Sequence, residues 1–148
     1  MQTDLVKQGY ILRTDWDDVI QRDFEIWYRF GDNPKISHYA NYFTRNQRNA
    51  AGFVHGGVIA TFLDHCMGSM CWRLSAGGQG WTITLNTQFI KPVRVNRWAF
   101  AEITHLSGTG SNLLFDAKLY QDRLDGTLVA QAQGSFTVPG KKAKKAID

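Results

Sequence analysis

The residues best able to do chemistry lie in the stretch from Asn49 to Leu74. Its second half is apolar on nearly every side, contains no proline, and can carry charge only at Asp64, His65 and Arg73. This pattern predicts a helix that is buried all round. Because an unpaired charge is costly to remove from water, Asp64 is expected to be neutral, compensated, or retained for a chemical task.

Two glycines, Gly56 and Gly57, follow His55 at the point where this helix is predicted to begin. A helix N-terminus offers unpaired backbone N–H groups and the positive end of the helix dipole, which suit an oxyanion. Two turns further on, Asp64 could activate water or attack a carbonyl carbon itself. The alternatives are a structural aspartate paired with a basic group, a glycine needed only for close packing, and a structural histidine.

Other polar side chains near this stretch could assist such chemistry. Asn49 could hold water or a carbonyl group through its amide, and Thr82 could orient water or steady Asp64. A turn asparagine and an ordinary strand threonine are the alternatives. His65 and Cys66 adjoin Asp64 and suggest a metal, but neighbouring helical residues point about 100° apart and no second cluster has zinc-like spacing. No metal is therefore expected.

The rest of the chain predicts the elements that position these residues. Residues 36–44 form a first strand, and four runs with a period of two follow the glycines at 77–80. Residues 108–112 and 125–126 supply hairpin turns. One face of the sheet is apolar and must be buried, and the helix is too apolar to be exposed to solvent. The sequence therefore predicts an α+β fold, with a five-stranded antiparallel sheet wrapped around a central apolar helix, as one domain over residues 1–140.

An additional N-terminal helix is expected over about residues 15–30. Apolar and aromatic side chains recur there at helical spacing, and aspartates stand in the first turn. We interpret it as an accessory helix over a sheet edge or the mouth of a pocket. The alternative is that Trp27, Tyr28 and Phe30 line a substrate pocket.

Composition and charge limit the classes of function. The chain has 148 residues and a formal net charge of +4, and four lysines lie within residues 141–148. That basic segment is predicted to be a disordered, solvated tail, with a phosphate- or membrane-binding arm as the alternative. Because the remaining chain is close to neutral, no nucleic-acid partner is expected.

Hydropathy and the placement of the cysteines indicate the cellular compartment. No apolar run is long enough to span a bilayer, and the first ten residues do not resemble a signal peptide. A cytoplasmic protein without a membrane partner is expected. Cys66 and Cys71 point in different directions on the predicted helix, so reduced thiols are expected at both positions.

Six positions in order carry a family resemblance: Asn49, Gly52, His55, Gly56, Gly57 and Asp64. Their spacing resembles the active-site segment of hotdog-fold acyl-CoA thioesterases, in particular the phenylacetate-pathway (PaaI-like) branch. The likeness covers about residues 41–138, where Thr82 takes the place of the family's active-site Ser or Thr. It fades over the first forty residues.

The resemblance implies a hotdog fold and hydrolysis of an acyl-CoA thioester to a free acid and coenzyme A. No metal or organic cofactor is implied, since coenzyme A is part of the substrate. Asp64 would be the general base or the nucleophile, and the backbone N–H of Gly56 would be the oxyanion donor. One such donor contributes about 3 kcal/mol in the transition state.

The spacing of Gly56 and Asp64 implies that two chains form each site. Asp64 lies about 12 Å beyond Gly56 along the helix axis, so one carbonyl can hardly touch both within a single chain. In the resembling family, the helices of a two-fold dimer run antiparallel. One subunit would then supply the helix start with His55 and Asn49, and the other would supply Asp64 with Thr82. We expect a homodimer with two shared sites, and a homotetramer formed as a dimer of dimers.

Coenzyme A carries phosphates, which require cations near the channel mouth. Gly57 would adjoin the substrate, and the cations available in loops or at strand ends are Arg45, Arg48, Lys91, Arg94 and Arg97. Solvated surface charge is the alternative for each basic residue.

Two other functions remain open. A non-catalytic acyl-CoA binder or sensor would use the same pocket without turnover. A hotdog enoyl-CoA hydratase or dehydratase resembles a different pattern, in which an acidic residue pairs with a histidine near the helix start. His55 and Asp64 are too far apart in one chain for that pairing. The sequence does not identify the acyl group.

Overall fold

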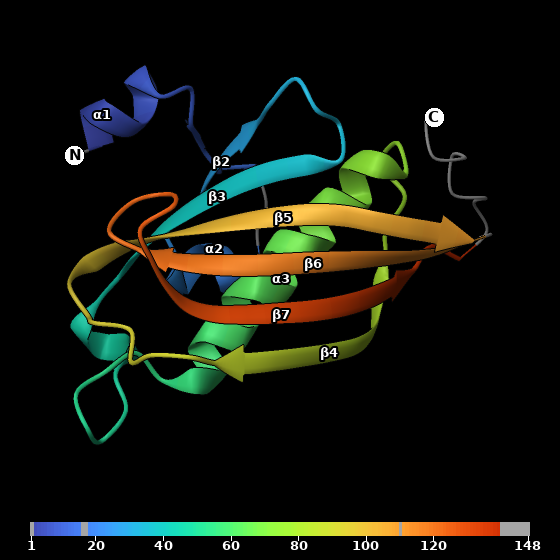
Figure 1. Ribbon diagram of the computed structural model, residues 1–148. Coiled ribbons are helices and arrows are strands. Elements are labelled where there is room, and N and C mark those ends of the chain that lie inside the picture. Colours follow the sequence, from blue (N-terminus) through green and yellow to red (C-terminus); the bar gives the residue numbers. More distant parts are fainter. Residues whose placement is uncertain (1, 16–17, 110, 140–148) are drawn as a thin grey trace.

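One long helix, α3 (Gly56–Leu74), lies across one face of an antiparallel sheet in the computed structural model (Figure 1). The structure describes residues 2–15, 18–109 and 111–139, so the predicted basic tail lies outside the described residues. No helix within these ranges is long and apolar enough to cross a membrane.

Local signals at both ends set the length of α3. His55 stands just before the helix in an extended conformation, and its imidazole caps the first turn. At the other end Ala76 and Gly77 adopt left-handed φ values of 53° and 83°. The N–H of Gly77 then bonds to the carbonyl of Trp72 at 2.9 Å, which closes the helix.

The five predicted strands are confirmed, and two short strands extend the sheet at one edge. All neighbouring strands are antiparallel, in the order β1-β2-β3-β5-β6-β7-β4. The bounds are β1 (Ile11–Leu12), β2 (Trp27–Phe30), β3 (Ile36–Phe43), β4 (Trp81–Phe89), β5 (Arg97–Thr109), β6 (Asn112–Gln121) and β7 (Thr127–Thr137).

The main core lies between α3 and the inner face of the sheet. Strand β6 shows the alternation that builds it, since every second side chain is buried. The largest side chains buried there are Tyr39, Phe43, Phe62, Phe115, Phe136, Leu63, Met67 and Met70. Cys66 and Cys71 are buried free thiols, as expected, and burial raises the pKa of Cys71 to about 11.

The N-terminal region differs from the expected helix over residues 15–30. The helix there, α2 (Val19–Asp23), is short and is capped by the Asp18 carboxylate, while Trp27–Phe30 form strand β2. These residues form a strand and not a helix because their backbone groups pair with β3, where Trp27 lies opposite Ala40 and Tyr28 opposite Tyr39. Neighbouring side chains of the strand therefore point to opposite faces of the sheet.

A second apolar cluster covers the outer face of the sheet, opposite α3. A further helix that the sequence did not suggest, α1 (Gln2–Lys7), contributes Leu5 to it. The other buried members are Tyr10, Trp27, Ala40, Trp98 and Phe100. The N-terminal segment therefore packs against both faces of the sheet. Leu5 of α1 joins the outer cluster, and α2 lies behind the sheet beside α3 (Figure 1).

Candidate active site

Asp64 and Thr82 lie together, as the sequence predicted for one end of the site. Asp64 projects from the middle of α3, and the register of β4 with β7 places Thr82 opposite Phe136 on the inner face of the sheet. The Thr82 hydroxyl donates a hydrogen bond to Asp64 Oδ1 at 2.9 Å. The threonine therefore holds one carboxylate oxygen in a fixed position.

The environment of Asp64 favours proton uptake. Burial raises the pKa of this carboxyl above its ordinary value, and the hydrogen bond from Thr82 lowers it by a smaller amount. Among the described residues, no ion pair involves Asp64. The alternative of a structural aspartate neutralised by a basic group therefore has no support in the fold.

A cavity of about 600 Å³ opens beside Asp64. Its walls come from the C-terminal half of α3, the loop after it, the inner face of the sheet and the segment before α2. The lining residues are Asp15, Asp18, Asp64, His65, Gly68, Trp72, Gly77, Gln79, Gly80, Thr82 and Phe136. Trp27, Tyr28 and Phe30, the aromatic residues considered from the sequence, do not line it.

His65 stands next to Asp64 but faces the N-terminal segment. Burial lowers the pKa of His65 to about 4, so its imidazole is neutral near pH 7. It also lines a small hollow with Arg13, Asp18 and Phe24. Within the described ranges, no group of three or more His, Cys, Asp or Glu side chains could hold a metal ion.

The other predicted end of the site is built around the start of α3. The Nδ1 atom of His55 accepts a hydrogen bond from the backbone N–H of Gly57 at 2.9 Å. The imidazole that makes this bond carries its proton on Nε2, where it can donate to a ligand. The N–H of Gly56 has no hydrogen-bond partner among the described residues. This is normal for the first residue of a helix, which has no helical carbonyl group one turn before it.

Asn49 lies beside this helix start in a tight loop. Its Oδ1 accepts from the N–H of Phe53 at 3.2 Å, and Gly52 completes the turn with a φ of 88°. The carboxamide oxygen thus shapes the loop, which leaves the NH₂ group to meet a ligand. A cavity of about 320 Å³ adjoins it, lined by Asn49, Phe53, Val54, Gly56, Ile59, Phe89, Ile90, Lys91, Pro92 and Val93.

The predicted basic residues are all exposed, and four of them lie around this smaller cavity or near it. Lys91 lines it directly. Arg48 and Arg94 form backbone bridges with Val54 and Phe53, which line it too. Arg45 lies further away along the chain, in the short helix η1 (Arg45–Gln47).

The predicted site residues therefore form two groups within one chain. Asn49, His55 and Gly56 gather at the start of α3, whereas Asp64 and Thr82 lie at its middle beside a different cavity. The helix rise separates the two groups by about 12 Å, as expected.

Sequence reasoning missed several residues of this region. A Cβ atom added at Gly56 would lie 3.2 Å from the Phe89 ring, so that ring covers the helix start. Gly68 lies one turn after Asp64, a spacing visible in the sequence. No sequence signal places Phe136 in the same cavity.

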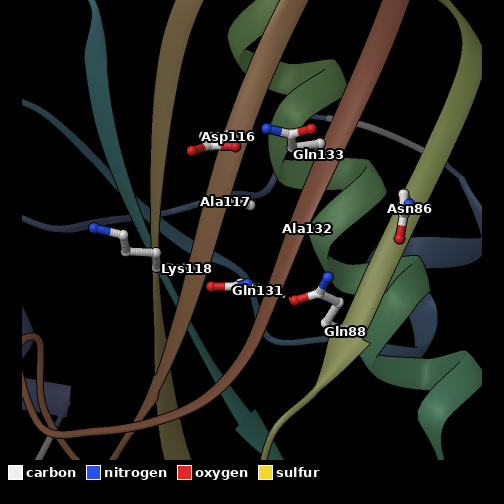
Figure 2. Close-up of a pocket in the computed structure, with 8 residues that line it drawn as sticks. All are labelled: Asn86, Gln88, Asp116, Ala117, Lys118, Gln131, Ala132 and Gln133. Atoms are coloured by element: carbon white, nitrogen blue, oxygen red, sulfur yellow. Dashed lines mark hydrogen bonds between the residues drawn. The ribbon is translucent and has the colours of Figure 1, made fainter.

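Another hollow, of about 250 Å³, lies on the outer face of the sheet (Figure 2). Amide side chains from β4 and β7 surround it together with Asp116 and Lys118, and Gln131 donates to Gln88 at 2.6 Å. Figure 2 shows α3 behind the sheet, on the side away from these side chains. We regard this hollow as a solvated sheet face, since it contains none of the predicted site residues.

Comparisons with known proteins place the fold and the family. A family model described as the thioesterase superfamily matches residues 51–125. The E. coli PaaI protein from the phenylacetic acid degradation operon is 14% identical, with a TM-score of 0.72 over 95% of this chain and 94% of that one. No curated protein matches the sequence.

Two streptococcal structures are similar as well. A Streptococcus mutans protein bound to acetyl-CoA is 16% identical, with a TM-score of 0.66 over 88% of this chain and 95% of that chain. A hypothetical thioesterase from Streptococcus pneumoniae with coenzyme A is 15% identical, with a TM-score of 0.67 over 90% and 98%. The predicted hotdog arrangement is confirmed as the fold.

Proposed function

Because the chain belongs to the thioesterase superfamily, we propose that it is an acyl-CoA thioesterase of the PaaI-like branch. It hydrolyses an acyl-CoA to a free acid and coenzyme A. The observation that carries the proposal is the Asp64 carboxylate, which is held by Thr82 at 2.9 Å beside a cavity of about 600 Å³. Similar folds crystallised with acetyl-CoA and coenzyme A support the substrate class.

The proposed reaction requires two copies of the chain. Asp64 and the N–H of Gly56 adjoin different cavities, so a partner must bring the second group. Strand β4 forms one edge of the sheet and exposes Trp81, Ile83 and Phe89 by 57%, 54% and 55%. An edge with such side chains favours pairing with a second copy. A homodimer with two shared sites follows, and two such dimers would form the homotetramer.

In this dimer the two ends of the site have separate tasks. Asp64 takes a proton from water as the oxygen attacks the thioester carbonyl, and the Gly56 N–H receives the developing negative charge. The Nε2–H of His55 and the NH₂ of Asn49 orient the carbonyl. The carbon–sulfur bond then breaks, and the coenzyme A thiolate takes the proton from Asp64. In the alternative course, Asp64 attacks the carbonyl directly, the carbon–sulfur bond breaks to release the coenzyme A thiolate, and water hydrolyses the mixed anhydride that remains.

The coenzyme A moiety of the bound substrate would extend along the smaller cavity at the helix start. Lys91 lines that cavity, and Arg48 and Arg94 form backbone bridges with two of its lining residues, Val54 and Phe53, so these three cations would meet the phosphates. Gly57 would keep the approach free of side chains, and Arg45 would extend the basic surface.

Release of free thiol from a panel of acyl-CoAs tests this function. We expect Asp64→Asn to lower kcat by about 100- to 10,000-fold, because a positioned general base contributes this much. Acyl-CoA binding, measured by calorimetry, should persist in the variant. Tight binding without turnover by the wild type would instead indicate a sensor, and hydration of an enoyl-CoA would indicate a hydratase.

A further inference from the structure

We propose that the cavity beside Asp64 receives an uncharged acyl group laid along α3 over Gly68, and that Gly68 is the residue that admits acyl groups larger than acetyl. This inference rests on the proposed thioesterase function and names its substrate class. The shape of the cavity and the charges on its walls carry it.

Three lining residues form one face of α3. Asp64, Gly68 and Trp72 follow each other at intervals of four, so they lie one above another on the same side of the helix. They span about 12 Å along the axis. A thioester carbonyl at Asp64 would therefore direct its acyl chain across Gly68 toward Trp72.

Gly68 forms the floor of this path. A Cβ atom added there would lie 3.6 Å from the Phe136 ring, an ordinary van der Waals contact. Alanine therefore fits, but each further carbon of a side chain would project into the space beside Asp64. The absence of a side chain here is what keeps the cavity continuous between the carboxylate and the indole.

Trp72, Gly77 and Gly80 line the far end of the cavity. Trp72 is 42% exposed, and its indole lies 3.7 Å from a Cβ atom added at Gly77. A Cβ atom at Gly80 would come within 2.6 Å of Cys71 Sγ, so this wall has no room for a side chain. A volume of about 600 Å³ exceeds what an acetyl group needs and fits a longer chain or a ring.

The charges on the walls exclude one class of acyl group. Asp15, Asp18 and Asp64 line the cavity, and no Lys or Arg is among its described lining residues. Arg13 approaches Asp15 at 3.7 Å from outside the cavity and offsets only part of this charge. A second carboxylate at the end of the acyl chain would meet like charges without a cation, so monothioesters of dicarboxylic acids should be rejected.

A matched pair of substrates tests the charge argument in the full-length wild type. Hexanoyl-CoA and adipoyl-CoA have acyl chains of the same length, and only adipoyl carries a terminal carboxylate. We expect kcat/KM for hexanoyl-CoA to exceed that for adipoyl-CoA by about 100-fold or more, since like-charge contacts are costly. Equal values for the two substrates would overturn the inference.

The role of Gly68 is tested by Gly68→Ala and Gly68→Leu. Both residues favour a helix more than glycine does, so the variants should fold. We expect Gly68→Leu to lower the ratio of kcat/KM for hexanoyl-CoA to that for acetyl-CoA by about 10- to 200-fold, and Gly68→Ala to lower it less. An unchanged ratio in Gly68→Leu would overturn the assignment.

A binding measurement separates this inference from the proposed function. Hexanoyl-CoA in the cavity should quench the fluorescence of Trp72, and Trp72→Phe should remove that part of the signal. If the wild type hydrolyses no acyl-CoA, the thioesterase proposal fails. Quenching by hexanoyl-CoA and not by adipoyl-CoA would even then support an uncharged acyl group in the cavity. Absence of quenching by hexanoyl-CoA would contradict it.

Discussion

At the scale of single residues, the proposed activity depends on how Asp64 is held. Burial raises the pKa of its carboxyl, and the hydroxyl of Thr82 partly opposes this by donating to the charged form. A general base must be deprotonated before it can act. In the proposed reaction, the raised pKa therefore moves the acid limb of the activity profile to a higher pH than an exposed aspartate would give.

Thr82→Val tests this balance. The substitution removes the hydrogen bond that lowers the pKa of Asp64, so the pKa should rise further and the acid limb of kcat/KM against pH should move to higher pH. Thr84→Val is the matched control on the same strand, since Thr84 bonds to Ser135 at 2.6 Å and not to Asp64. A limb that stays in place in Thr82→Val, or moves equally in both variants, would contradict the assignment.

At the scale of elements, the N-terminal segment shows how pairing overrides a local pattern. Trp27, Tyr28 and Phe30 fit a helical pattern, yet the edge of β3 offers backbone groups that β2 can bond. Alternation then buries Trp27 in the outer cluster and leaves Phe30 37% exposed. The segment serves as a cover on both faces of the sheet, and these aromatic residues form no part of the cavity beside Asp64.

Trp27→Ala and Phe30→Ala should therefore differ sharply in stability. Trp27 is 6% exposed, so its loss should lower the free energy of unfolding by about 3–5 kcal/mol. Phe30 is on the surface under the Arg73 guanidinium at 4.3 Å, and its loss should cost about 1 kcal/mol or less. Urea unfolding followed by circular dichroism measures both, and similar losses would argue against the strand.

At the scale of the whole molecule, one chain holds two separate halves of the proposed site. The half at the helix start contains Asn49, His55 and Gly56, and the other contains Asp64 and Thr82. A rigid helix cannot bring them together, because its rise per residue is fixed. Activity therefore belongs to the proposed dimer and should be lost with it.

Mixing two inactive variants tests this arrangement. Asp64→Asn removes the base, and His55→Asn removes the Nε2–H donor while keeping a residue that caps helices well. A hybrid dimer of the two has one site with both changes and one site with neither. Co-expression with random pairing should therefore restore about a quarter of the wild-type activity per protein. Activity no higher than that of either variant alone would rule out shared sites.

The predictable part of the fold came from local patterns. Alternating side chains placed four of the five long strands, strand-forming residues placed the strand at 36–44, and the apolar run after His55 placed α3, because these local patterns record which face of an element is hidden. The separation of Gly56 from Asp64 was predictable too, since it depends only on helix geometry. The bond between Thr82 and Asp64 agrees with the predicted pairing of these residues, although their roles await the measurements described above.

Tertiary structure alone decided the rest. Strand β2 exists because β3 has a free edge, which no local pattern in residues 15–30 records. The cavity beside Asp64 combines residues as distant in sequence as Asp15, Gly80 and Phe136. Its shape depends on how the sheet, α3 and the N-terminal segment pack, and packing joins side chains without regard to their order in the chain.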